Sequence, residues 1–501
     1  MVSEVAPFGL HNARLEPVPT ALPAADRAAR GKAARAEMPR AGHAGFKPTA
    51  DRPDPVSLLE SQGASRIPEL LPIRYGRMLA SPYAFFRGAA LLMASDLAAT
   101  PVSGLTVQTC GDAHLSNFGM FASPERRLVF DINDFDETLP GPWEWDVKRL
   151  TASAEVAARH NGFDDEERRE VVVAAVARYR RTMRGLARMG EVDAWQSPAD
   201  VDELGQHYQA ILGERERRLA DASLTRARDR AGLHSLEKLV CLVPDPAAKK
   251  VRKAAKAKAG VEAVKTRELR FVTDPPLLVP LADLPDEESS IGLEAHLNGI
   301  MANYRRTLEW DRRFLIGKYQ VADMARKVAG IGSVGMRCWV VLLTGRDQED
   351  RLFLQIKEAV PSVLSEFLGA SPYPSHGERV VAGQRLMQAA SDAFLGWHPT
   401  RSVLAQDYYV RQLRDWKFSL AVEDMDPPAM RTYAELCGRT LARAHARSGD
   451  RIAIAAYLGK SSVFDQAVAD FAADYADQNE RDLASLAAAV ESGRVEADPD
   501  A

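Results

Sequence analysis

Two short apolar segments in the first third of this sequence each run directly into an acidic loop. Residues 105–109 lead into GDAHLSN at residues 111–117, and residues 127–132 lead into DFD at residues 134–136. Short apolar runs bounded by glycine and polar residues are typical of buried strands. Because helical patterns flank these strands on both sides, the sequence predicts an α+β fold in which the two acidic loops act as a pair.

The spacing of the polar residues in these loops fits phosphoryl transfer. That reaction needs a carboxylate near the attacking hydroxyl, ligands for magnesium, a lysine on the phosphates and a backbone cradle. Asp112 and Asn117 lie five positions apart (117 − 112), which is the spacing between the base and the metal-binding asparagine in kinase catalytic loops. Asp134 follows a strand and is expected to bind the metal directly, with Asp136 in a supporting position.

The stretch that contains these loops resembles the catalytic half of aminoglycoside phosphotransferases and choline kinases, which share the protein-kinase-like fold. Their pattern is His-Gly-Asp-x-x-x-x-Asn, then Asp-Phe/Trp-x, then an aspartate that opens a helix. The resemblance implies that Asp112 is the base and that Asn117 and Asp134 hold magnesium. It also implies that Asp146 is a structural clamp on the loop. Cys110 stands where these families have a supporting histidine, so the departure leaves the catalytic set intact.

A second group of motifs lies far downstream. The sequence GIGSVG at residues 330–335 has a glycine spacing that also occurs in dinucleotide-binding folds. In those folds a helix follows the glycines, whereas here residues 337–343 have the pattern of a strand. Glycines at a hairpin are the arrangement of phosphate-covering loops in kinases. The residues expected to lie at the phosphates are Gly330, Gly332, Ser333 and Gly335.

The strand predicted at residues 352–357 ends in Lys357, 22 positions after Gly335 (357 − 335). It looks like the Val-Ala-Ile-Lys strand of kinases, whose lysine pairs with the phosphates. A kinase lysine needs a helix-borne glutamate to orient it. Glu378 is the first candidate for that glutamate, and Glu366 is the alternative.

Two arginines, Arg87 and Arg411, are candidates for contact with phosphate. Arg411 lies in residues 407–413, which look like the strand that enters the hinge where adenine would stack. The parts of a kinase-like site are thus present in exchanged order, with the catalytic loop first and the nucleotide-covering lobe second. A circular permutation explains this order, because permutation is tolerated where the original termini lie close together. Residues 437–446 resemble the helix that runs just before the catalytic loop in unpermuted phosphotransferases.

The sequence therefore predicts a two-lobe, circularly permuted protein-kinase-like fold with a large helical insertion. A basic run at residues 249–256, inside that insertion, is interpreted as a solvated helix face or loop. The predicted parts begin with a partly disordered or surface-bound N-terminal arm (1–60), the catalytic-loop part of the C-lobe (61–160) and the mainly helical insertion (161–315). They continue with the nucleotide-covering lobe (316–420) and the C-terminal helices that complete the C-lobe (421–501).

From about residue 51 onward, the chain resembles a bacterial family known as domain of unknown function 2252. The family is grouped with kinase-like proteins, and the resemblance implies no particular substrate. The segments that carry it are RYGRM (74–78), CGDAHLSNFG (110–119), FDINDFDE (130–137), GQRLMQ (383–388) and YVRQL (409–413).

The composition argues against several classes of partner and site. The formal net charge is only −4, and no aromatic residues interleave with the basic run, so neither nucleic acid nor a membrane is an expected partner. No apolar run reaches the roughly 20 residues that a membrane span needs. The four cysteines lie far apart, which argues against a disulfide framework or a zinc site. A reducing compartment follows, with the cytoplasm as the expected location.

The function expected from the sequence is transfer of the γ-phosphoryl group of ATP, with Mg²⁺, to a hydroxyl acceptor. A small alcohol, a sugar, an antibiotic and a protein are all open as acceptors, as is the oligomeric state. Nucleotidyl (AMP) transfer on the same scaffold and nucleotide sensing without turnover are alternatives. The Gly-Asp-x-His pattern also occurs in metallophosphoesterases, but the further metal-binding motifs of those enzymes are missing. His114 is open to contact with substrate or metal, or to packing within the loop.

Overall fold

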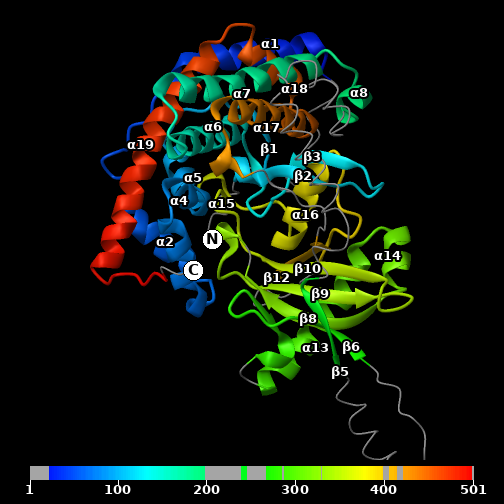
Figure 1. Cartoon of the computed structure of the whole chain (residues 1–501). Coiled ribbons are helices and arrows are strands. Elements are labelled where there is room, and N and C mark those ends of the chain that lie inside the picture. The colour runs from blue at the N-terminus through cyan, green and yellow to red at the C-terminus, as the bar shows by residue number, and fades with distance from the viewer. Residues whose placement is uncertain are drawn as a thin grey trace, which may run out of the picture.

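The computed structural model describes residues 22–197, 238–244, 267–284, 287–328, 330–398, 406–413 and 421–498. These residues form a mixed α+β structure, so the predicted fold class is confirmed at that level. A body of helices lies on one side and an antiparallel sheet on the other, and short strand pairs lie between them (Figure 1). The positions of the sheet, the body and the two acidic loops decide where a site can form.

The described residues include one six-stranded antiparallel sheet, in the order β11-β12-β10-β9-β8-β7. Within it, Lys357 of β10 lies opposite Cys338 of β9 and Tyr409 of β12. Alternate residues of a strand point to opposite faces, and Leu354 and Ile356 pack in the cluster that includes α13, so Lys357 points to the other face. The elements are β7 (Leu278–Pro280), α13 (Glu287–Tyr304), β8 (Gln320–Lys327), β9 (Cys338–Thr344), β10 (Arg351–Ala359), β11 (Gly396–His398) and β12 (Asp407–Gln412).

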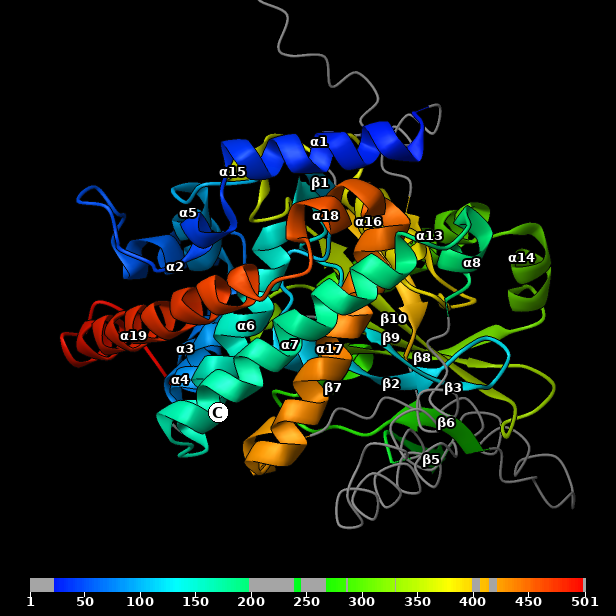
Figure 2. The same cartoon turned by 90° about the horizontal axis from the view of Figure 1, so that it is seen from above.

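The helical body surrounds α6, which is buried over nearly its whole length. Close helix contacts depend on glycine: a Cβ atom at Gly438 of α17 would lie 2.2 Å from the carbonyl oxygen of Ala175 in α7. A Cβ atom at Gly31 of α1 would likewise lie 2.0 Å from the carbonyl oxygen of Ala453 in α18, and Figure 2 shows α1 lying across the top of the body. The helices are α1 (Ala24–Glu37), α6 (Trp143–His160), α7 (Asp165–Leu186), α17 (Pro427–Ser448), α18 (Arg451–Leu458) and α19 (Val463–Glu491).

Two strand pairs carry the acidic loops. β1 pairs with β4 and β2 pairs with β3, both antiparallel. Residues 110–117 connect β1 to β2, and residues 133–138 connect β3 to β4. The amide nitrogen of Asn133 donates to the carbonyl oxygen of Asn117 at 2.8 Å, which ties the two loops together. The strands are β1 (Thr106–Thr109), β2 (Phe118–Ala122), β3 (Leu128–Ile132) and β4 (Leu139–Pro142).

Short helices fill the space between the body and the sheet. α16 packs closely against the second acidic loop, because a Cβ atom at Gly383 would lie 2.5 Å from the side-chain methyl carbon of Thr138. Helices α2 to α5 form a group beside α6 and α19 (Figure 1). The bounds are α2 (Pro55–Gly63), α3 (Leu71–Leu79), α4 (Pro82–Gly88), α5 (Ala90–Ala98), α15 (Ser365–Leu368) and α16 (His376–Met387).

The described residues of the region expected to be a mainly helical insertion, residues 161–315, include strands as well as helices. Its first helix, α7, packs into the helical body beside α17, and β7 extends the large sheet. The described residues between them include the short helix α8 (Glu191–Trp195) and the antiparallel pair β5 (Val240–Pro244) and β6 (Arg267–Phe271). The basic run at 249–256 lies outside the described residues.

Burial explains why these strands belong to the sheet layer. Leu269 and Phe271 occupy alternate positions of β6, so both point to one face. That face covers part of the large sheet in a single buried cluster, whose core members are Leu269, Phe271, Leu278, Ala325, Val340, Leu342 and Phe353.

The described part of the expected N-terminal arm, residues 22–60, contains α1, the short 3-10 helix η1 (Arg40–His43) and most of α2. α1 is poor in large apolar residues, and its contact with the body depends on small and charged ones. Arg27 is buried and its Nε donates to a carboxylate oxygen of Asp450 at 3.0 Å. These residues are therefore a folded part of the helical body.

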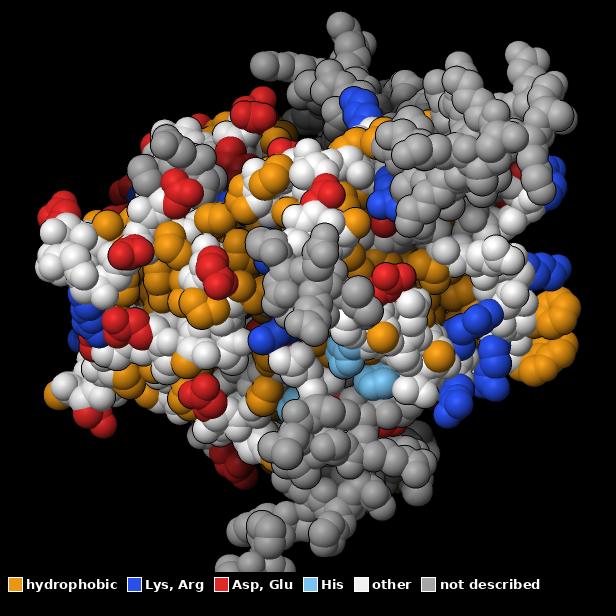
Figure 3. Space-filling view, turned by 90° about the horizontal axis from the view of Figure 1, so that it is seen from below, with side chains coloured by type: hydrophobic (Ala, Val, Ile, Leu, Met, Phe, Trp, Pro, Cys, Tyr) orange, Lys and Arg blue, Asp and Glu red, His pale blue; other side chains and the backbone are white. Residues whose placement is uncertain are grey.

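The face seen from below carries a hydrophobic projection edged by lysine and arginine side chains, on the side where α14 (Trp310–Ile316) lies (Figure 3). On α14, Trp310 is 76% exposed and Phe314 is 63% exposed, and the two rings stack with centroids 6.0 Å apart. Within the described ranges, no helix combines the length and apolar character that crossing a membrane requires.

Candidate functional site

A cavity of about 530 Å³ lies between the helical body and the large sheet. Both acidic loops, the glycine turn, β10 and β12 contribute side chains or backbone to its walls. The structure thus brings together residues from the two halves of the chain that sequence motifs singled out separately. The predicted site residues that line this cavity are Asp112, Asn117, Asp134, Asp136, Gly330, Gly332, Ser333, Lys357 and Arg411.

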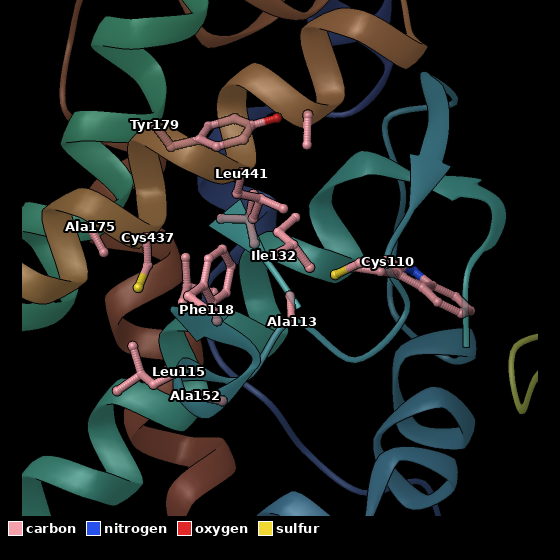
Figure 4. Packing of buried hydrophobic residues seen from close by; sticks show 14 of the residues in the cluster. Cys110, Ala113, Leu115, Phe118, Ile132, Ala152, Ala175, Tyr179, Cys437 and Leu441 are labelled. Atoms are coloured by element: carbon pink, nitrogen blue, oxygen red, sulfur yellow. The ribbon is translucent and has the colours of Figure 1, made fainter. Parts of the chain in front are cut away.

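The first acidic loop is anchored by its apolar residues. Cys110, Ala113 and Leu115 are at most 1% exposed and point into the core among α6, α7 and α17 (Figure 4). Asp112 and Asn117, from the positions between and after them, line the cavity. Ala113 and Leu115 therefore anchor the loop in the core while its polar side chains remain at the cavity.

Glycine is required at the start of this loop. Gly111 has φ +81°, a conformation that other residues rarely adopt. A Cβ atom there would also lie 2.2 Å from the carbonyl oxygen of Glu137, which belongs to the second acidic loop. The glycine of GDAHLSN thus permits the close approach of the two loops.

Asp146, in the first turn of α6, holds the backbone of the loop. Its two carboxylate oxygens accept hydrogen bonds from the amide nitrogens of Cys110 and Gly111, at 2.8 and 3.0 Å. The Nε2 atom of His445, on α17, lies 3.1 Å from the same carboxylate, and the hydroxyl of Tyr179 lies 2.8 Å from its Nδ1. The predicted clamp is therefore confirmed, and α17 supports it from near the C-terminal end of the chain.

Asp112 is fixed on one side and open on the other. The Nε atom of Arg149 donates to one of its carboxylate oxygens at 2.9 Å, and the Nε2 atom of His114 lies 3.6 Å from the other. Burial lowers the pKa of His114 to about 4, so this imidazole is neutral near pH 7. The Asp112 side chain keeps 18% of its surface exposed, on the wall of the cavity. Such a carboxylate is oriented but still within reach of a ligand.

Asn117 and Asp134 carry side-chain oxygens on the cavity wall that could hold a magnesium ion. The side-chain nitrogen of Asn117 donates to the carbonyl oxygen of Asp112 at 2.7 Å, which leaves its amide oxygen for another partner. Asp134 is 30% exposed, and one of its carboxylate oxygens accepts the amide proton of Asp136 at 3.0 Å. Mg²⁺ prefers oxygen ligands and usually keeps several waters, binding through one or two protein groups together with phosphates. This pair of residues fits that requirement.

The described residues contain no group of three or more His, Cys, Asp or Glu side chains arranged to hold a metal on their own. A site formed by Asn117 and Asp134 would therefore be completed by the ligand's phosphate oxygens and by water. That is the usual situation for magnesium in enzymes that bind nucleoside triphosphates.

Lys357 projects from the sheet toward the second acidic loop. Its ammonium group pairs with the carboxylate of Asp136 and lies 3.7 Å from a carboxylate oxygen of Asp134. The hydroxyl of Tyr409 donates to the second oxygen of Asp136 at 2.6 Å. Burial by itself would lower the pKa of Lys357, but the charges of Asp134 and Asp136 outweigh it and raise that pKa well above its usual value. Lys357 is therefore a buried, permanently charged cation at the cavity wall.

The glutamates expected to orient Lys357 do not line the cavity. Glu378 lies in the first turn of α16 and Glu366 lies in α15. The buried side chain of α16 that faces the acidic loop is that of Arg379, the next residue. It donates to the carbonyl oxygens of Asp136 and Thr138, at 2.8 and 2.7 Å. Helix α16 thus supports Lys357 through the backbone that carries Asp136.

The glycine turn, with the short helix η6 (Ile331–Ser333), connects β8 to β9. It is held from the N-terminal helices by Arg66, which donates to the carbonyl oxygens of Val334 and, at 2.9 Å, Gly332. The amide nitrogen of Ile67 donates to the carbonyl oxygen of Gly335 at 2.8 Å, and Gly335 itself, with φ +85°, lies outside the cavity wall. The turn is fixed in place by these bonds, and no feature of the sequence near Arg66 predicts this role.

Arg411 and Asn133 form a further polar group on the wall. The Nε atom of Arg411 donates to the side-chain oxygen of Gln355 at 3.0 Å, and another guanidinium nitrogen donates to the carbonyl oxygen of Asn133 at 3.1 Å. Asn133 is 4% exposed, and neither its amide oxygen nor its amide nitrogen has a hydrogen-bond partner in the described structure. Buried polar groups normally have partners, so Asn133 is a candidate ligand contact. The only sequence feature that points to Asn133 as a site residue is its position next to Asp134.

Comparison with known proteins gives a family and nothing further. A family model described as "Uncharacterized protein conserved in bacteria (DUF2252)" matches residues 66–489, which is most of the chain. No curated protein matches, and no solved structure matches. The matched span contains both acidic loops, the glycine turn and Lys357.

Proposed function

This chain belongs to the DUF2252 family, and we propose that it is an ATP- and Mg²⁺-dependent phosphotransferase that moves the γ-phosphoryl group to a hydroxyl acceptor. The observation that carries the proposal is the meeting of Lys357 with Asp134 in the cavity that Asp112, Asn117 and the glycine turn also line. A lysine, a metal-binding pair, a carboxylate and a glycine-rich turn are the parts that this reaction requires.

We further propose that the fold is a circularly permuted protein-kinase-like fold. The antiparallel sheet with its glycine turn and Lys357 corresponds to the nucleotide-covering lobe, and the helical body with both acidic loops corresponds to the catalytic lobe. The exchanged order is supported by α17, which lies near the C-terminus yet reaches Asp146 through His445 at 3.1 Å. The helix that would precede the catalytic loop in an unpermuted chain is thus beside it in space.

The proposed mechanism assigns one task to each polar group. The carboxylate of Asp112 accepts the proton of the acceptor hydroxyl as its oxygen bonds to the γ-phosphorus. The bond from that phosphorus to the bridging oxygen of ADP breaks, and ADP leaves. Lys357 and the backbone of the glycine turn hold the phosphates. Asn117 and Asp134 would hold Mg²⁺, which would supply positive charge to the phosphate oxygens.

The cavity has suitable size and charge for this ligand. Its volume of about 530 Å³ lies within the range of roughly 300–1,000 Å³ that is typical of small-molecule sites. Lys357 now pairs with Asp136, so a triphosphate would have to compete for a cation that already has a partner. Mg²⁺ held by Asp134 would reduce that conflict, because it would supply positive charge to the acidic loop while the phosphates attract Lys357.

The test is calorimetry with purified protein and ATP, with Mg²⁺ and with the metal chelated. The expected result is saturable binding that requires the metal. Incubation with ATP labelled at either the γ- or the α-phosphorus then separates the reactions, because phosphoryl transfer moves only the γ-label and nucleotidyl transfer only the α-label. Binding of ATP without release or transfer of either label would support a sensor instead. Absence of metal-dependent ATP binding contradicts the proposal.

A further inference from the structure

Arg87 is a cation on the cavity wall to which the proposed mechanism assigns no task. It lies in the last turn of α4, and its side chain reaches the cavity beside Asp112. Its Nε atom is buried and has no hydrogen-bond partner among the described residues, and its guanidinium lies 6.0 Å from the ring centroid of Tyr83. No carboxylate within the described ranges pairs with it. A partly buried guanidinium without an anion is costly unless a ligand supplies the anion.

Arg87 is fixed in position relative to the glycine turn. A Cβ atom at Gly332 would lie 3.7 Å from the carbonyl oxygen of Arg87, so the two backbones are in contact. Arg66, in the connection that follows α2, donates to the carbonyl oxygen of Gly332 at 2.9 Å. The turn that would cover the phosphates and the residue Arg87 are thus held together.

Arg87 is also fixed in position relative to Asp112. One guanidinium nitrogen of Arg149 donates to the carbonyl oxygen of Phe86 at 2.8 Å, and its Nε donates to Asp112 at 2.9 Å. The hydroxyl of Tyr83, one turn earlier in α4, lies 2.9 Å from the hydroxyl of Ser116 in the first acidic loop. One arginine therefore links the backbone next to Arg87 with the carboxylate that would act as the base.

From these contacts we infer that Arg87 binds the phosphoryl group during its transfer and stabilises the negative charge on its oxygens. The inference rests on the proposed function. In that reaction the transferred group lies between the phosphate-covering turn and the base, and Arg87 is connected to both. An arginine in this role forms charge-assisted hydrogen bonds that strengthen as charge builds up, and arginines of this kind contribute about 10³–10⁵ in turnover in other phosphoryl-transfer proteins.

The experiment compares the binding of Mg·ADP with and without aluminium fluoride, which mimics the transferred group and requires no acceptor. Wild-type protein is expected to bind Mg·ADP at least about 100-fold more tightly when aluminium fluoride is present. Arg87→Ala is expected to keep the affinity for Mg·ADP alone within about threefold and to lose most of the enhancement. Arg87→Lys should recover part of it, since one cation returns without the planar fork. Arg30→Ala, an exposed arginine of α1, is the matched control.

The outcomes separate this inference from the proposed function. If wild-type protein binds neither Mg·ADP nor Mg·ATP, the proposed function itself fails. If Mg·ADP binds but Arg87→Ala keeps the full enhancement, or wild-type protein shows none, Arg87 does not contact the transferred group. An arginine that instead holds an anionic acceptor would also leave the enhancement unchanged, because no acceptor is present. Should Arg87→Ala fail to fold, Arg87→Lys and Arg87→Gln provide the same comparison.

Discussion

The ammonium nitrogen of Lys357 lies 3.7 Å from a carboxylate oxygen of Asp134, although 223 positions (357 − 134) separate the two residues in the chain. The contact joins the central strand of the large sheet to the loop after β3. It is the link between two sets of motifs, each of which has ordinary explanations when taken alone. A lysine at a strand end can be a solubilising group, and acidic turns are common on surfaces. In the structure both groups lie in the wall of one cavity, together with Asp112 and Asn117.

Lys357→Ala is expected to weaken Mg·ATP binding by tenfold or more, because the substitution removes the buried cation nearest to Asp134 and Asp136. The two carboxylates then also lack their common counter-ion, so the variant should unfold at a lower temperature. Calorimetry measures the first effect and thermal denaturation the second. Lys32→Ala, an exposed lysine of α1, should change neither. Unaltered ATP affinity in Lys357→Ala, with the fold intact, would count against the assignment.

Asp112→Asn is expected to leave Mg·ATP binding within about twofold and to lower turnover by about 10²–10⁴, the usual contribution of a general base. An asparagine oxygen still accepts the hydrogen bond from Arg149, so the loop should keep its shape. The measurement is the Mg-dependent release or transfer of the γ-label, beside calorimetry on the same samples. Asp51→Asn serves as the surface control. If turnover survives in Asp112→Asn, another group acts as the base.

Asp134→Asn and Asp136→Asn are expected to differ in their dependence on magnesium. Asp134 has the more exposed carboxylate and is the proposed metal ligand, so its substitution should raise the Mg²⁺ concentration needed for half-maximal ATP binding. Asp136 is bonded to Lys357 and Tyr409, so its substitution should mainly destabilise the protein. Magnesium titrations at fixed ATP and denaturant unfolding distinguish the two. Equal magnesium requirements in both variants would contradict the assignment of Asp134.

Much of the candidate site can be predicted from the sequence because its parts are local motifs. Asp112 and Asn117 share one loop, Asp134 follows a strand and Lys357 lies within one, and the apolar pattern of both strands is clear. Such patterns depend on neighbouring residues, so no knowledge of distant contacts is needed to find them.

The partners that cross between segments were not predictable in this way. The expectation of Glu378 beside Lys357 rests only on the number of residues between them. In the folded protein the side chain of α16 that contacts the acidic loop is that of Arg379. Arg66 donates a hydrogen bond to the glycine turn from 266 positions away (332 − 66), and the residues around Arg66 form no motif that predicts this contact. β8 is mostly exposed in its first half, so it lacks the apolar alternation by which strands are recognised.

Asp146→Ala is expected to lower the free energy of unfolding by roughly 3–5 kcal/mol, because it leaves two buried amide protons and His445 without an acceptor. Asp146→Asn should cost less, since one oxygen remains to accept one of the two amide protons. Urea unfolding at pH 7 measures both. The clamp interpretation also requires that Asp146→Asn lower turnover while ATP affinity stays within a few-fold. Equal stability of Asp146→Ala and wild-type protein would contradict it.

Glu137→Gln is expected to alter the pH dependence of stability, because burial raises the pKa of Glu137 from 4.5 to about 7. Below pH 4.5 the carboxyl is protonated in both the folded and the unfolded chain, and it has no effect. Between pH 4.5 and 7 the unfolded chain ionises while the folded protein keeps the proton, so stability falls as the pH rises, by an amount on the order of 2–3 kcal/mol. Glutamine does not titrate, so the variant should gain stability relative to wild-type protein between pH 5 and pH 8. Urea unfolding midpoints at those two pH values measure the gain, and Glu166→Gln, on the surface of α7, should show none.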